Sequence, residues 1–206
     1  MVMREWLNRC PLIAILRGIE PTEVGDVFSE LLAAGIVIAE IPLNSPEPFK
    51  SIELAATQFS GRMLVGAGTV TRLEDVERVY TAGARLVVSP HADSAIVQET
   101  KRLGMLSIPG VGSATEAFAM VATGADALKL FPADVLGTRM LTGLRAVLPK
   151  GTMMLPVGGV DHATIPAWRA SGADGYGVGS ALFRPGISKS QLGANARRLA
   201  ECLDEA

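Results

Sequence analysis

Short apolar runs alternate with amphipathic segments along the whole chain. The apolar runs are bounded by glycine, proline and polar turn residues, a pattern that predicts buried β-strands. We predict eight strands, at residues 11–17, 36–43, 62–65, 85–89, 105–108, 126–132, 152–157 and 175–178. Apolar residues at helical spacing predict a helix after each strand. These helices are expected at 20–34, after Pro46, and at 73–82, 93–103, 113–124, 138–148, 161–171 and 187–203.

The predicted elements repeat as strand–helix units with a period of roughly 20 to 25 residues. Strands with near-continuous apolar sequence are typical of a parallel sheet that helices cover. Eight units favour a closed (β/α)8 TIM barrel, an α/β fold with an eight-stranded parallel sheet, over an open doubly wound sheet. No linker or shift in composition divides the chain, so we expect a single domain over residues 1–206. Three helix-to-strand junctions share one kind of turn, namely Ala33-Ala34-Gly35, Ala82-Gly83-Ala84 and Ser171-Gly172-Ala173.

The overall composition narrows the function classes. The chain has 206 residues, of which 49% are hydrophobic, and this is enough for one sizeable core. A net charge of −2 argues against a nucleic-acid surface, and no apolar run is long enough to span a membrane. The first residues lack the apolar core and the small-residue cleavage site of a signal peptide, so we expect a cytoplasmic protein.

The cysteines and histidines do not indicate a metal site. Cys10 and Cys202 lie near opposite ends of the chain without metal-ligand spacing, and we expect both to be reduced. His91 and His162 each follow a predicted strand, and neither has a partner at ligand spacing. We therefore expect surface histidines, no metal ion and no cofactor.

One lysine interrupts the apolar strand predicted at 126–132. Alternation along a strand places Ala127, Lys129 and Phe131 on one face. Burying an ammonium group is costly and favours loss of its proton. A neutral lysine in a dry site is what Schiff-base chemistry with a carbonyl compound requires. The alternative is a lysine whose ammonium group extends to water and takes no part in chemistry.

One carboxylate interrupts the strand predicted at 36–43 in the same way. Alternation places Ile38, Glu40 and Pro42 on one face. A buried carboxylate needs either a partner or a role that tolerates a raised pKa. Two alternatives follow: a structural ion pair with Lys129, or an acid/base that shuttles protons while the lysine forms the covalent adduct.

Two further polar residues follow predicted strands, and barrel chemistry collects at that end of the strands. Arg17 ends the first strand, where its planar fork can bind a substrate carboxylate; the alternative is a surface salt bridge. Thr69 follows the glycine-rich turn 66–68 and can donate to the same carboxylate; the alternative is an ordinary helix N-cap.

Turns that contain glycine follow the last two predicted strands. Gly158 and Gly159 follow the strand at 152–157, and Gly179 and Ser180 follow the strand at 175–178. Loops at these two places often hold a phosphate group in (β/α)8 enzymes, because glycine lets backbone N–H groups approach the oxygens. We expect a phosphate site here; the alternative is a pair of plain tight turns.

Five segments together resemble a known family over nearly the whole chain. In chain order they are Arg17-Gly18-Ile19, Glu40-Ile41-Pro42-Leu43-Asn44-Ser45-Pro46, Gly66-Ala67-Gly68-Thr69-Val70, Lys129-Leu130-Phe131-Pro132-Ala133 and Val157-Gly158-Gly159-Val160. They resemble the 2-keto-3-deoxy-6-phosphogluconate and 6-phosphogalactonate aldolases.

The resemblance implies a homotrimeric (β/α)8 class I aldolase that cleaves a phosphorylated sugar acid to pyruvate and glyceraldehyde 3-phosphate without metal. It implies that Lys129 is the Schiff-base lysine and Glu40 the acid/base. Gluconate-type members usually carry arginine four residues after this glutamate, where this chain has Asn44. The segment Asn44-Ser45-Pro46, together with Arg17, resembles the galactonate branch. The two substrates differ only in configuration at C4.

The mechanism that we expect starts with Arg17 and Thr69 orienting the substrate carboxylate. Lys129 then forms an iminium at C2, which is the electron sink for breaking the C3–C4 bond. Glu40, directly or through a water, takes the C4 hydroxyl proton and later returns a proton to C3. A phosphosugar isomerase or epimerase that uses Glu40 as a base, or a non-catalytic phosphometabolite-binding barrel, would use the same residues without an imine.

Overall fold

The computed structural model describes residues 2–204. The strands are β1 (Leu12–Ile15), β2 (Ile38–Pro42), β3 (Leu64–Gly68), β4 (Leu86–Val88), β5 (Leu106–Ile108), β6 (Gly110–Val111), β7 (Leu128–Leu130), β8 (Met154–Pro156) and β9 (Tyr176–Val178). The α-helices are α1 (Met3–Arg9), α2 (Val24–Ala33), α3 (Pro48–Gln58), α4 (Leu73–Thr81), α5 (Ser94–Arg102), α6 (Ala114–Thr123), α7 (Ala133–Val147), α8 (Ile165–Ala170) and α9 (Lys189–Asp204). A short 3-10 helix, η1 (Pro21–Glu23), precedes α2.

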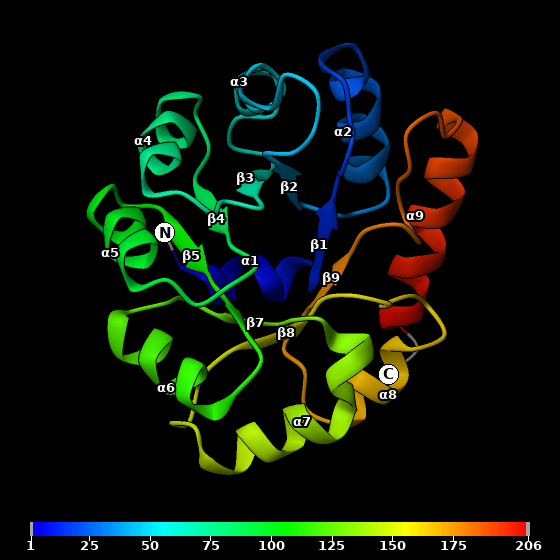
Figure 1. The fold of residues 1–206 in the computed structure, drawn as a ribbon. Coiled ribbons are helices and arrows are strands. Elements are labelled where there is room, and N and C mark those ends of the chain that lie inside the picture. The colour runs from blue at the N-terminus through cyan, green and yellow to red at the C-terminus, as the bar shows by residue number, and fades with distance from the viewer. Residues whose placement is uncertain (1, 205–206) are drawn as a thin grey trace.

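The strands form two parallel sheets with the helices α2 to α9 outside them (Figure 1). One sheet has six strands in the order β5-β4-β3-β2-β1-β9, and the other has three strands in the order β6-β7-β8. The prediction of a single closed eight-stranded sheet, and with it the TIM barrel, is therefore wrong, although the α/β class and the parallel pairing are as expected.

Two breaks separate the sheets, and proline lies at each of them. Pro109 lies between β5, which pairs with β4, and β6, which pairs with β7. Pro156 ends β8, and beyond it a single bridge joins Val157 to Gly177 of β9. Because proline has no N–H group, it cannot donate to a ladder of hydrogen bonds. The pattern of apolar residues alone does not show where the hydrogen bonding between two neighbouring strands ends.

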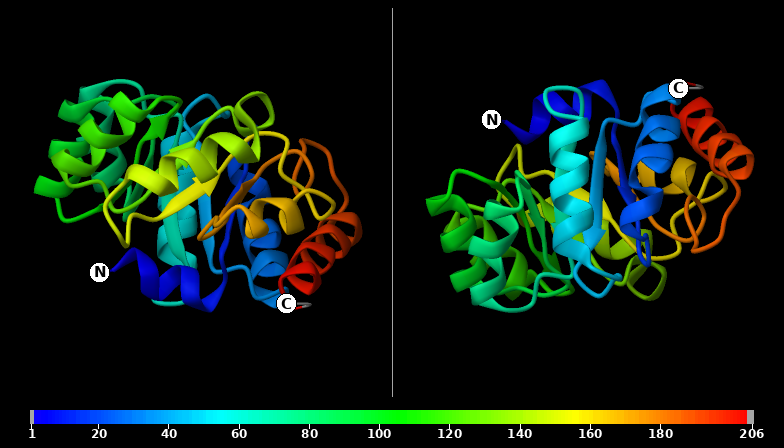
Figure 2. Two further views of the ribbon diagram at one scale, coloured as in Figure 1. Left: turned by 90° about the horizontal axis from the view of Figure 1, so that it is seen from below. Right: turned by 90° about the horizontal axis from the view of Figure 1, so that it is seen from above.

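The sequence pattern did not predict helix α1. Figure 2 shows it at one end of the molecule. Arg4 donates to the carbonyl of Gly151, which lies just before β8, and Arg9 donates to the carbonyl of Arg62, just before β3. The helix thus covers the N-terminal ends of the strands and leaves the opposite ends free for a site.

The predicted helix at 138–148 begins earlier than its apolar pattern indicates. It is part of α7, which starts at Ala133, and Gly137 interrupts the helical backbone with a φ of 72°. This positive φ suits glycine, which has no Cβ to clash. None of the helices within residues 2–204 is both long enough and apolar enough to span a membrane.

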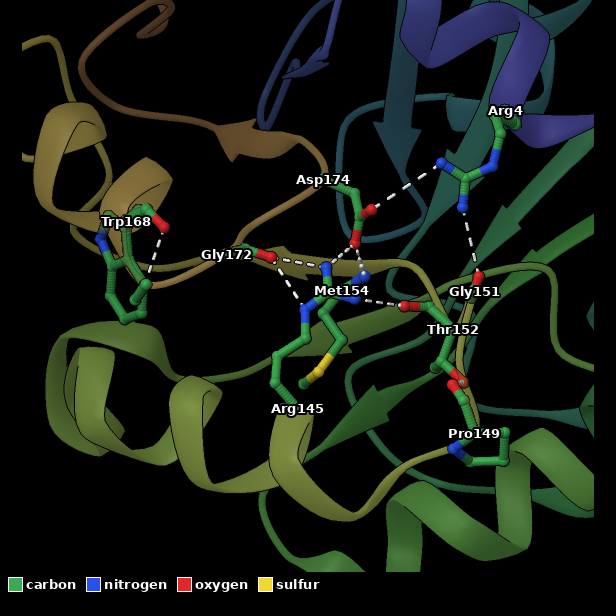
Figure 3. Close-up of polar contacts among 10 residues, drawn as sticks. Arg4, Arg145, Pro149, Gly151, Thr152, Met154, Trp168, Gly172 and Asp174 are labelled. Carbon is green, nitrogen blue, oxygen red and sulfur yellow. Dashed lines mark hydrogen bonds and ion pairs between the residues drawn. The ribbon is translucent and has the colours of Figure 1, made fainter.

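Two aspartates, each just before a strand, accept hydrogen bonds from other strands and helices in the same way. We call each of these sets of hydrogen bonds an aspartate tie. Asp174, just before β9, accepts hydrogen bonds from the Met154 N–H at the start of β8 and from the Arg145 guanidinium of α7 (Figure 3). Asp126, just before β7, accepts from the Ser107 N–H of β5 and from Lys101 Nζ of α5. Each aspartate therefore joins its own strand to an earlier strand and helix.

We expect Asp174→Ala to lower the free energy of unfolding by about 2 kcal/mol, because it leaves the Met154 N–H without its acceptor and leaves the Arg145 guanidinium with only the carbonyls of Gly172 and Thr152. The side chain is only 18% exposed, so water replaces this acceptor poorly. Chemical denaturation measures the change. Glu99→Ala is the control, since the Glu99–Arg102 pair lies on the surface and exposed pairs contribute little. Equal stability of Asp174→Ala and Glu99→Ala would contradict the role of the tie.

Candidate active site

A cavity of about 320 Å³ opens at the C-terminal ends of the strands. It brings together seven of the eight predicted site residues, and Thr69 is the one outside its lining. The lining residues are Ile15, Arg17, Glu40, Lys129, Phe131, Val157, Gly158, Gly159, Val160, Gly177, Gly179, Ser180, Phe183, Arg184 and Pro185. The charged side chains from the strands and the glycine-containing loops after β8 and β9 therefore line the same cavity.

Lys129 lies in the middle of β7 and is 6% exposed. Burial lowers its pKa below the usual range for lysine, and the positive charge of Arg17 lowers it further, while Glu40 acts in the opposite direction. Its Nζ lies 4.5 Å from the centroid of the Phe131 ring, a contact that favours the charged form. Burial outweighs these opposing effects, and it raises the fraction of neutral, nucleophilic amine at neutral pH.

Glu40 lies in the middle of β2 and is 2% exposed. Burial raises its pKa to about 7, although Lys129 and Arg17 both favour the ionised form. Its Oε2 atom has no hydrogen-bond partner, and the effect of Lys129 on it acts through space. In the described chain the two side chains do not form the direct ion pair of the structural alternative. A carboxyl group with this pKa exchanges protons readily near neutral pH.

The space for the Glu40 carboxyl group comes from a glycine in the next strand. Gly68 ends β3, and a Cβ atom at this position would lie 1.8 Å from Glu40 Oε2. Any larger residue at position 68 would displace the carboxyl group. The glycine-rich segment after the third predicted strand thus has a steric purpose that the sequence analysis did not identify.

Thr69 adopts a φ of 53°, which is unusual for a β-branched residue. The helix that follows begins at Leu73 and has Arg72 as its N-cap. Thr69 is therefore not the N-cap of this helix, and it also lies outside the cavity lining. Its strained backbone stands next to the glycine that accommodates Glu40.

Arg17 extends from the end of β1 to the cavity and contacts the loop after β2. Its Nη1 atom donates to Asn44 Oδ1 at 2.9 Å, and the neighbouring Gly18 N–H donates to Ser45 Oγ at 3.0 Å. The surface salt bridge of the alternative is not formed by Arg17 within residues 2–204, where its hydrogen-bond partner is an amide oxygen. The hydrogen-bond partner of the guanidinium is therefore an uncharged group.

The predicted phosphate loops form the other wall of the cavity. Gly158 and Gly159 have φ values of 108° and 65°, which only glycine adopts readily. Arg184 also lines this wall, and its Nε atom donates to the Ser180 carbonyl at 2.9 Å. Arg184 is not among the site residues predicted from the sequence. The available signal was a cation four residues after Ser180, in the loop that follows the last strand.

The histidines lie away from the cavity. His91 Nε2 is 3.8 Å from Asp93 Oδ2, and both side chains are largely solvent-accessible. Nowhere in residues 2–204 do three or more histidine, cysteine, aspartate or glutamate side chains gather in a way that could hold a metal ion.

A family model described as KDPG and KHG aldolase matches residues 3–196, a range that includes every residue lining the cavity. The chain belongs to the KDPG and KHG aldolase family. The family resemblance found in the sequence is thus confirmed.

Two named proteins and one solved structure are similar to this chain over most of its length. A protein of Rhizobium meliloti, named probable 2-dehydro-3-deoxy-6-phosphogalactonate aldolase, is 44% identical over 88% of this chain and 86% of its own. The Escherichia coli 2-dehydro-3-deoxy-6-phosphogalactonate aldolase is 37% identical over 98% of each chain. A solved structure described as native KDPGal superimposes with a TM-score of 0.94, at 37% identity over 96% of each chain.

We expect Gly68→Ala to lower the free energy of unfolding by about 2 kcal/mol, because the new methyl group overlaps the Glu40 carboxyl group. In a Glu40→Ala background the same change should cost much less, since the overlapping group is gone. Denaturation of the four proteins of this double-mutant cycle measures the coupling. Gly112→Ala is the control, because its nearest neighbour would lie 3.7 Å away. Additive effects at positions 40 and 68 would refute the steric argument.

Proposed function

We propose that this family member is a class I Schiff-base aldolase that cleaves 2-dehydro-3-deoxy-6-phosphogalactonate to pyruvate and D-glyceraldehyde 3-phosphate. The observation that carries the proposal is a buried lysine of lowered pKa that shares one cavity with a buried carboxyl group of raised pKa. The names of the Rhizobium meliloti and Escherichia coli relatives support this substrate over its C4 epimer, the gluconate compound.

Imine formation is the first covalent step of the proposal. The neutral Lys129 amine adds to the C2 carbonyl of the substrate, and loss of one water with uptake of one proton gives an iminium. Arg17 binds the C1 carboxylate through the donors of its fork that remain free. Thr69 was expected to share this task, but it does not line the cavity, so the proposal places the carboxylate on Arg17.

Cleavage follows because the iminium accepts an electron pair. Glu40, as carboxylate, takes the proton of the C4 hydroxyl group, the C3–C4 bond breaks, and its electrons pass to the iminium to give an enamine. Glyceraldehyde 3-phosphate leaves. The Glu40 carboxyl group then returns its proton to C3, and water hydrolyses the resulting iminium to free pyruvate, the Lys129 amine and the proton taken up at the first step. The carboxyl group and the amine end in their starting states.

The phosphate group of the substrate lies, in this proposal, between the loops after β8 and β9. Backbone N–H groups of Gly158, Gly159 and Gly179 and the hydroxyl group of Ser180 supply donors. Arg184 adds the positive charge that these neutral donors lack. The proposal also takes the chain to act as one domain in a cytoplasmic homotrimer.

Borohydride trapping tests the proposal directly. We expect pyruvate and borohydride to attach a three-carbon adduct to the wild-type protein, and Lys129→Ala and Lys129→Arg to abolish both trapping and cleavage without unfolding. Mass spectrometry locates the adduct. A protein that cleaves or isomerises the substrate without any trapped adduct would instead use Glu40 as the base of an isomerase or epimerase. A protein that only binds would be the non-catalytic alternative.

Glu40→Gln separates cleavage from imine formation. Its amide cannot accept the hydroxyl proton, so cleavage and exchange of the pyruvate methyl protons with solvent should both fall roughly 100- to 10,000-fold. Trapping with pyruvate should survive, because the loss of this carboxylate removes an influence that raises the pKa of Lys129.

The pH dependence of kcat/KM, measured for the wild type and for Glu40→Gln, is an independent test of the role of Glu40. A base must be ionised, and the pKa of Glu40 is about 7, so wild-type kcat/KM for cleavage should rise with pH through about 7 and then level. In Glu40→Gln this rise should be absent. Methyl exchange at the wild-type rate in the variant would show that another group handles C3.

A further inference from the structure

We propose that Asn44 is a positioning residue that orients the Arg17 guanidinium for the substrate carboxylate, and that this task requires an uncharged acceptor. The inference rests on the proposed function. It starts from one contact, in which Arg17 Nη1 donates to Asn44 Oδ1 at 2.9 Å. Both side chains are exposed at the rim of the cavity, so the contact adds little to stability and its effect is on orientation.

The backbone beneath this contact is held by other groups. The Gly18 N–H donates to Ser45 Oγ at 3.0 Å, which ties the loop after β1 to the loop after β2. On its other side Gly18 packs against Pro185, whose Cγ would lie 2.7 Å from a Cβ at position 18. The loop positions therefore do not depend on Asn44. Its own contribution is to restrict a long arginine side chain that would otherwise sample many rotamers.

The neutral amide matters because Arg17 has two electrostatic tasks. Its charge attracts the substrate carboxylate, and it also lowers the pKa of both Glu40 and Lys129. An amide oxygen occupies one of the five guanidinium donors without cancelling the charge. A carboxylate at position 44 would hold the same guanidinium more strongly, but it would neutralise Arg17 and repel the carboxylate of the substrate.

Three variants distinguish a role of Asn44 in orienting Arg17 from a role in stabilising the loop after β2. Asn44→Leu removes the acceptor, Asn44→Asp keeps it and adds charge, and Ser45→Ala removes the neighbouring loop hydrogen bond without touching Arg17. The measurements are the pyruvate concentration that half-saturates borohydride trapping, KM and kcat for cleavage, and the denaturation midpoint. A purely structural contact would be kept or strengthened in Asn44→Asp, because charge-assisted pairs are the stronger ones.

We expect Asn44→Leu to raise both the half-saturating pyruvate concentration and KM by about tenfold, and Asn44→Asp to raise them more, with kcat changed much less. The rise of kcat/KM with pH should also move to higher pH in Asn44→Asp, because neutralised Arg17 no longer lowers the pKa of Glu40. Ser45→Ala should raise both values less than Asn44→Leu does, because Pro185 still packs against Gly18 and the Arg17–Asn44 contact remains.

Wild-type pyruvate affinity in Asn44→Asp would overturn the inference, and so would equal losses in Asn44→Asp and Ser45→Ala. Failure of the proposed function looks different, because the wild-type protein itself would then form no trapped adduct. Denaturation midpoints close to the wild-type value confirm that each comparison is made between folded proteins.

Discussion

The burial of one amine and one carboxyl group without a direct ion pair between them is the constraint on which this structure depends. Each group alone would be costly to bury in charged form. The protein meets that cost by shifting both pKa values toward neutrality, down for Lys129 and up for Glu40. Gly68 provides the room, and the strands on either side provide the apolar surroundings. The same shifts that make burial tolerable prepare the pair for proton transfer.

Much of this arrangement is visible in the sequence, because strand periodicity is strong. Lys129 and Glu40 each stand alone in an apolar run, and alternation is enough to place them toward the interior. The closure of the sheet was not predictable in the same way. The predicted strand at 105–108 ends before Pro109, but its apolar pattern does not show that the residues just beyond this proline form β6 and pair in a second sheet.

The rim of the site was less predictable than its interior. The contact of Arg17 with Asn44, 27 positions along the chain, depends on how two loops approach each other, and no local pattern encodes that. Arg184 lines the cavity while its Nε atom donates to the Ser180 carbonyl, and no local pattern predicts this loop conformation. Thr69 shows the reverse case, since its place after a strand suggested a site residue but it does not line the cavity.

The two aspartate ties lie at the starts of the strands, while the cavity lies beyond their ends. The parts of the chain that hold the scaffold together are thus separated in space from the parts that contact a substrate. Loops at the cavity rim can change length or composition without loosening Asp126 or Asp174. For an engineer, this geometry offers a scaffold whose selectivity can be redesigned by varying the rim loops while the heat resistance of the protein is improved separately at the other end.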